Sequence, residues 1–123
     1  MKVDGYFNSR NEPVIRLIFG SLSIEALVDT GFDGSLIMPI GFASNLDLQF
    51  KRLQFKGLED LCSPTGEKIV AKTYSMRMPW LGKTTPVFVM THPEFSEAIL
   101  GSHMLKDCRL TIDYRKRTVT IVR

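Results

Sequence analysis

The sequence EALVDTGFDG at residues 25–34 is the most informative stretch of this chain. Its apolar residues predict a strand that delivers the Asp29 carboxylate at its end, and Thr30 and Gly31 then turn the chain sharply. An Asp-Thr-Gly tripeptide alone is a weak signal, because Asp and Gly favour turns in any protein. The apolar strand before it is a stronger signal, because an ionisable group at the mouth of such a strand costs free energy that ordinary turns avoid. Two interpretations follow: a functional carboxylate, or a polar turn at a strand end.

Short strands dominate the sequence on both sides of this stretch. Apolar and polar residues alternate at period two, and the strand-like runs are separated by turn residues such as Gly20-Ser21, Pro79 and Gly82. The pattern predicts an edge strand at residues 6–8 and three hairpins, formed by residues 14–20 with 22–28, residues 73–78 with 84–90, and residues 110–114 with 119–121.

Helix is scarce in this sequence. Pro39 predicts the start of a short helix through Leu46, because proline suits the first helical position. Ser102 is expected to cap a single turn over residues 103–107. We therefore expect an all-β fold, a closed or nearly closed barrel with one or two short helices.

Length and composition limit the alternatives. The chain has 123 residues and a formal net charge of +3, so we expect one domain over residues 1–123 with no room for two lobes. No apolar run is long enough for a membrane span, and the N-terminal residues lack the apolar core of a secretory signal peptide. A cytoplasmic location and no membrane partner are therefore expected. Cys62 and Cys108 are expected to be reduced thiols, and the sequence shows no metal-ligand spacing. We expect no metal and no cofactor.

The positive charge is concentrated at the C-terminal end. Residues 106–123 contain six basic and two acidic residues. Such a cluster could contact the phosphates of a nucleic acid. A solvated hairpin tip is the favoured interpretation, because no aromatic residues alternate with the charges to stack on bases. We therefore expect no nucleic-acid partner.

A second motif, Ala98-Ile99-Leu100-Gly101-Ser102, places an apolar pair and a glycine before the expected helical turn. Together with Asp29-Thr30-Gly31, it resembles the retropepsin-like (clan AA) aspartic proteases, the single-domain dimeric relatives of pepsin. Residues 20–31 are similar to the opening of retroviral proteases. Residues 32–36 and 99–122 are more similar to the prokaryotic single-domain branch.

The resemblance implies an aspartic endopeptidase that hydrolyses a peptide or protein substrate. In this class a water molecule lies between two carboxylates that share one proton. This chain has one such motif, so the pair would be Asp29 of each protomer in a homodimer. By resemblance, Thr30 would brace the two loops across the dimer, and Gly31 would let the substrate backbone approach closely. The alternative is a dimerisation or peptide-binding module of the same fold that cleaves little or nothing.

The resemblance also implies a flap over the site, which we expect at residues 58–70 with a turn at residues 63–66 that includes Gly66. Asp33 matches an acidic position that binds substrate backbone and pairs with an arginine, although Glu12 stands where retroviral enzymes carry that arginine. In those enzymes the chain ends interleave in a sheet, whereas here the longer C-terminal hairpin could form a sheet edge or another contact. The expected apolar flap and pocket residues are Leu58, Leu61, Ile69, Val70, Val87 and Ile99, of which we assign Leu61 and Ile99, with Gly31, Asp33 and Gly66, to substrate binding.

Overall fold

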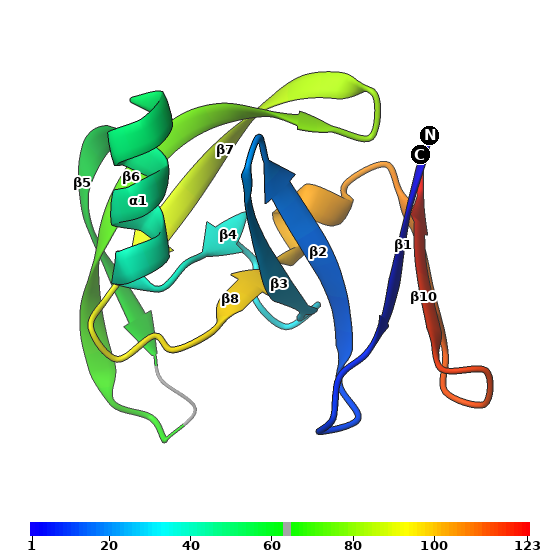
Figure 1. The fold of residues 1–123 in the computed structure, drawn as a ribbon. Helices are drawn as coiled ribbons and strands as arrows, with labels where there is room; N and C mark the ends of the chain where they lie inside the picture. Colours follow the sequence, from blue (N-terminus) through cyan, green and yellow to red (C-terminus); the bar gives the residue numbers. More distant parts are fainter. Residues whose placement is uncertain (63–64) are drawn as a thin grey trace.

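The computed structural model describes residues 1–62 and 65–123, which form one ten-stranded sheet with a single α-helix (Figure 1). The strands lie in the order β5-β6-β7-β4-β8-β3-β2-β1-β10-β9. In chain order the elements are β1 (Lys2–Phe7), β2 (Pro13–Phe19), β3 (Leu22–Val28), β4 (Leu36–Ile37), α1 (Ile40–Phe50), β5 (Gln54–Cys62), β6 (Lys68–Trp80), β7 (Lys83–Thr91), β8 (Ala98–Leu100), a 3₁₀ turn η1 (Ser102–Leu105), β9 (Arg109–Asp113) and β10 (Thr118–Val122).

The all-β expectation is confirmed, but the sheet of the described residues is not closed. It curls around the core, and β5 and β9 are its two end strands. The C-terminal hairpin β9–β10 forms one of these edges and pairs with β1 of the same chain, from Lys2 opposite Val122 to Tyr6 opposite Thr118. Strand β1 is therefore longer than the edge strand expected at residues 6–8.

The predicted hairpins form, with one difference in length. Gly20 adopts a positive φ of 61° at the turn between β2 and β3, as a tight hairpin requires. Strand β6 runs through Pro79, which pairs with Thr84, so the expected break at this proline is wrong. The turn is made instead by Leu81 and Gly82, with φ values of 49° and 84°.

The helical segments differ from the prediction at their ends. Helix α1 continues past Leu46 to Phe50, and Lys51 ends it in the left-handed conformation. Ser102 does not cap the turn η1: it is the first residue of that turn, Gly101 takes the capping position, and no side-chain capping bond forms. The Ser102 backbone N–H donates outside the turn, to the carbonyl of Phe32 at 2.7 Å.

Strand β6 contributes to two separate apolar clusters. Its C-terminal half places Met76, Met78 and Trp80 in the main core, where the Trp80 indole N–H donates to the carbonyl of Met104 at 2.8 Å. Its N-terminal half places Ala71 in a second, smaller cluster with Ile37 and Met90, against which Phe32, Leu61, Phe95 and Ile99 pack. This smaller cluster forms the floor of the candidate site.

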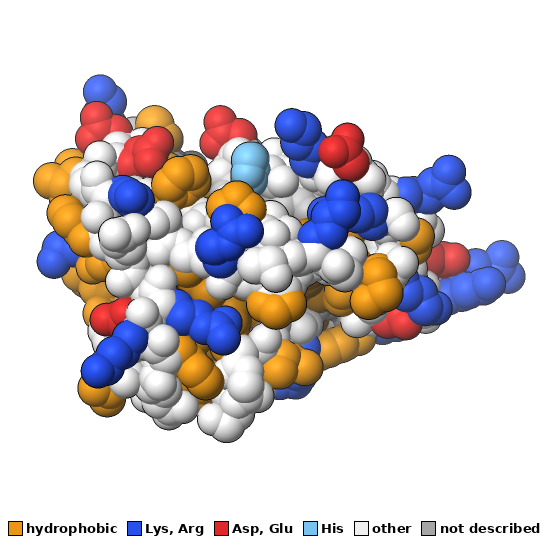
Figure 2. All heavy atoms as spheres, turned by 90° about the horizontal axis from the view of Figure 1, so that it is seen from above, with side chains coloured by type: hydrophobic (Ala, Val, Ile, Leu, Met, Phe, Trp, Pro, Cys, Tyr) orange, Lys and Arg blue, Asp and Glu red, His pale blue; other side chains and the backbone are white. Residues whose placement is uncertain are grey.

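The surface mixes apolar and charged side chains, as Figure 2 shows for the upper face. Basic side chains project at the right-hand end, where β9 and β10 lie in Figure 1. At the tip of this hairpin, Arg115, Lys116 and Arg117 are exposed, and the Asp113 carboxylate accepts the backbone N–H groups of Arg115 and Lys116 at 3.0 and 2.9 Å. Within the described residues, no helix combines the length and the apolar character that crossing a membrane would require.

Candidate active site

Asp29 follows directly after β3 and is held by its backbone and by its side chain. Its N–H donates to the carbonyl of Leu100 at 3.0 Å, which continues the parallel pairing of β3 with β8. Its carboxylate Oδ1 accepts the N–H of Gly31 at 2.9 Å, and its carbonyl accepts the N–H of Phe32 at 3.2 Å. These bonds fix the half-buried carboxylate in a tight turn at the mouth of the strand.

The two sequence motifs lie against each other. The loop between β3 and β4 is called the active-site loop below. Its carbonyls accept backbone N–H groups of the second motif and of the residue after it: Gly101 donates to Ser35 at 2.9 Å, Ser102 to Phe32 at 2.7 Å and His103 to Gly34 at 3.2 Å. Close backbone contact of this kind explains a glycine at position 101, because any side chain there would overlap the loop. The structure thus joins two stretches that are far apart in the sequence.

A cavity of about 420 Å³ opens beside Asp29. Of the residues predicted for the site, it is lined by Asp29, Gly31, Leu61 and Ile99. Thr30 and Asp33 are exposed and lie outside this lining, as does Gly66, which has a positive φ of 87°. Ser63 and Pro64 of the expected flap turn lie outside the described residues.

The structure brings only part of the wider apolar set predicted for the flap and pocket to the cavity. Ile69 lines the cavity together with Leu61 and Ile99. Val87 is instead buried in the main core, because β7 turns that side chain away from the site. Leu58 and Val70 are 67% and 51% exposed and are absent from the cavity lining. They lie on the opposite face of the β5–β6 hairpin, since side chains alternate along a strand and Leu61 and Ile69 face the cavity.

The cavity has five further lining residues that the sequence did not reveal: Phe32, Ile37, Cys62, Glu94 and Phe95. Phe32 stands next to the motif and could have been found from that position. Glu94 and Phe95 lie in the loop between β7 and β8, where no periodic pattern marks them. Both cysteines are free thiols, as expected, and no group of three or more His, Cys, Asp or Glu side chains within residues 1–62 and 65–123 is arranged to hold a metal ion.

A family model for the retroviral aspartyl protease matches residues 9–113. The chain belongs to the retroviral aspartyl protease family. Among solved structures it is similar to a retropepsin-like aspartic protease from Rickettsia conorii, with a TM-score of 0.67 and 17% identity, over 98% of this chain and 90% of that one. It is also similar to the foamy viral protease-reverse transcriptase in complex with an RNA/DNA hybrid, with a TM-score of 0.55 and 16% identity, over 78% of this chain and 12% of that one. No curated protein matches the sequence significantly.

In this family member, the loop after β7 forms one wall of the cavity and is fixed at both ends. At its start, His92 Nδ1 accepts the N–H of Glu94 at 3.0 Å, and the His92 carbonyl accepts the N–H of Phe95 at 3.0 Å. The His92 and Phe95 rings also pack at 5.6 Å. At its other end, Glu97 forms an ion pair with Arg10.

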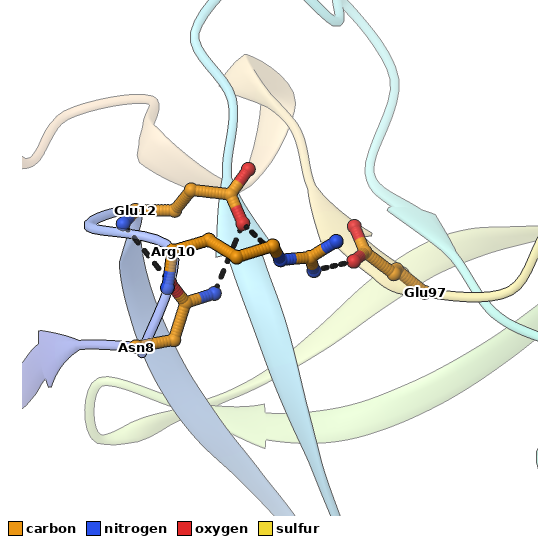
Figure 3. Close-up of polar contacts among 4 residues, drawn as sticks. All are labelled: Asn8, Arg10, Glu12 and Glu97. Carbon is orange, nitrogen blue, oxygen red and sulfur yellow. Dashed lines mark hydrogen bonds and ion pairs between the residues drawn. The ribbon is translucent and has the colours of Figure 1, made fainter.

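The Arg10–Glu97 pair belongs to a polar cluster at the turn between β1 and β2 (Figure 3). Arg10 also pairs with Glu12 at 3.1 Å. The Asn8 Oδ1 atom accepts the backbone N–H groups of Arg10 and Glu12, both at 3.0 Å, and its Nδ2 donates to the Glu12 carboxylate at 3.0 Å. The cluster links this turn to the cavity wall, whereas Asp33 forms no ion pair within the part of the chain that the structure describes.

A second polar cluster carries a testable pH dependence. The Tyr6 hydroxyl donates to the Glu25 carboxylate, and this hydrogen bond raises the pKa of Tyr6 above its ordinary value of 10.0. The fold therefore favours the protonated phenol, and this stabilisation is fully present below about pH 10 and lost as the pH rises through the raised pKa. We expect the Tyr6→Phe variant to lose less stability than the wild type when the pH rises from neutral to above 10. The measurement is the urea midpoint of unfolding of both proteins at the two pH values. Identical changes in midpoint for both proteins would contradict it.

Proposed function

We propose that this chain is a homodimeric aspartic endopeptidase in which a water molecule is activated between two Asp29 carboxylates, one from each protomer. The observation that carries the proposal is the placement of Asp29: its carboxylate is fixed by the Gly31 N–H at 2.9 Å and lines a cavity of about 420 Å³ with mostly apolar walls. Membership of the retroviral aspartyl protease family supports peptide hydrolysis as the reaction. The whole chain, residues 1–123, acts as one domain in this proposal.

The second carboxylate has to come from a second copy. Within one chain the motif Asp-Thr-Gly occurs once, and a two-fold axis places identical residues opposite each other. Two adjacent carboxylates share one proton, because close like charges cannot both ionise. The ionised member takes a proton from water while the protonated member donates a hydrogen bond to the scissile carbonyl. The exposed Thr30 braces the two loops across the dimer, as the family resemblance implies.

The substrate occupies the cavity beside this pair. Leu61 and Ile99 contact a substrate side chain, and Gly31, which has no side chain, lets the substrate backbone pass close to Asp29. Asp33 contacts the substrate backbone, and Gly66 lies in the flap that closes over it. The positive φ of 87° at Gly66 suits a turn at the tip of the β5–β6 hairpin.

The proposal is tested by the dependence of cleavage on pH. The purified chain should hydrolyse a denatured protein or a peptide library, and kcat/KM should follow a bell-shaped profile with an acidic optimum. The bell arises because only the singly protonated carboxylate pair is active. A flat profile across the acidic range would contradict the mechanism. Peptide binding without cleavage at any pH, in a normal dimer, would favour a binding module instead.

A further inference from the structure

The cavity that contains Asp29 has an unbalanced charge. Its described lining includes two acidic residues, Asp29 and Glu94, and no lysine, arginine or histidine. The chain as a whole has a formal net charge of +3, so the cavity is acidic in a protein that is basic overall. A concave surface of one sign attracts ligand groups of the opposite sign. The cavity therefore favours a cationic group on its ligand.

The Glu94 carboxylate is available to a ligand. It forms no ion pair with any residue in the ranges 1–62 and 65–123, and its residue is exposed. Glu97, in the same loop, is by contrast already engaged by Arg10. The two glutamates of this loop thus differ in role: Glu97 holds the loop in place, and Glu94 lines the cavity without an ion-pair partner.

The backbone around Glu94 is ordered before any ligand arrives. Its N–H donates to His92 Nδ1 at 3.0 Å, and the next N–H, that of Phe95, donates to the His92 carbonyl at 3.0 Å. A ligand that binds here does not have to order this turn, so the contact with Glu94 is less opposed by lost conformational entropy.

The other walls of the cavity suit a long side chain. They are formed by Phe32, Ile37, Leu61, Ile69, Phe95 and Ile99. Lysine and arginine bury their methylene stems along apolar surface while the cationic head remains at a polar rim. We propose that Glu94 is a specificity-determining residue, which selects peptides with lysine or arginine at the position bound in this cavity. The inference rests on the proposed function, since it assigns a substrate preference to the same site.

A matched peptide panel tests the preference. Each of the three positions on either side of the cleaved bond carries lysine, methionine or glutamate in turn, and kcat/KM is measured for each peptide. At one position, lysine should be preferred over the uncharged methionine by about two- to fivefold, the range of a solvent-exposed ion pair. Glu94→Gln should remove this preference, and Glu94→Lys should shift it towards glutamate. Glu25→Gln is the control, because it removes a negative charge from β3 outside this cavity and should leave the preference unchanged.

The outcomes separate this inference from the proposed function. An equal lysine preference in wild type and Glu94→Gln, or no preference at any position, would overturn the role of Glu94 while cleavage itself stands. If no peptide is cleaved, the proposed function fails, and fluorescence anisotropy with the same labelled peptides decides the inference. Tighter binding of lysine peptides that is lost in Glu94→Gln would then support it, and equal or absent binding would overturn it.

Discussion

Asp29→Asn is expected to abolish peptide hydrolysis, lowering kcat by a factor on the order of 10⁴, as removal of a central catalytic group does in other proteases. In the proposed homodimer the substitution changes both members of the carboxylate pair at once. The amide cannot ionise, so neither protomer provides a base for the water. The substitution nearly preserves shape, and the Asn side-chain oxygen can still accept the Gly31 N–H that Asp29 Oδ1 accepts at 2.9 Å. Loss of activity would therefore report chemistry rather than loss of the fold.

The measurement is steady-state cleavage of one peptide, with the oligomeric state checked by sedimentation. Asp107→Asn is the matched control, because it makes the same chemical change at an exposed turn. Asp107 has a φ of 61°, a conformation that asparagine tolerates well. The control should keep its activity. Turnover by Asp29→Asn at the wild-type rate would show that this carboxylate is not the catalytic group.

Gly101→Ala is expected to lower the free energy of unfolding by about 3 kcal/mol, the upper end of the usual range for overpacking. A Cβ atom at this position would stand 2.2 Å from the Gly34 carbonyl oxygen, 2.5 Å from Phe32 Cδ2 and 2.8 Å from the Phe32 carbonyl oxygen. Two of these atoms belong to the backbone of the active-site loop, so the overlap cannot be relieved by a change of rotamer. The φ of −93° is allowed for alanine, and the effect is therefore steric alone.

Urea denaturation of Gly101→Ala and Gly41→Ala makes this comparison direct. Gly41 lies in α1, where an added Cβ meets nothing within 4 Å, and alanine favours helix by up to about 1 kcal/mol over glycine. The control should be at least as stable as the wild type. If Gly101→Ala unfolds at the same urea concentration as the control, the two motifs are not packed as closely as the short Cβ distances indicate.

The sequence was sufficient to single out both motifs of the candidate site, but the hydrogen bonds that join them are visible only in the structure. The first motif stands out because a carboxylate at the end of an apolar strand costs free energy. The second has a glycine because the backbone of the active-site loop comes too close for a side chain. The C-terminal hairpin was also predictable, because residues 110–114 and 119–121 alternate at period two on both sides of a polar turn. These are features in which local pattern and tertiary role agree.

Other features depend on contacts that a local pattern does not record. Strand β4 has two residues, Leu36 and Ile37, too few for any periodicity, yet it bridges β7 and β8. Glu94 and Phe95 line the cavity from a loop that is held by His92 at its start and by the Arg10–Glu97 ion pair at its other end. The sequence left open whether the sheet closes, since a closed barrel and a curled sheet require the same strand patterns and differ only in whether β5 meets β9.

The pairing of β1 with β10 has a consequence for assembly. The N- and C-termini lie side by side in Figure 1, and the chain completes this part of its sheet with its own residues. A single chain therefore leaves neither of these two strands without a neighbour in the sheet. Under the proposed mechanism, the partner would then be needed to supply the second carboxylate rather than to complete the sheet at the chain ends.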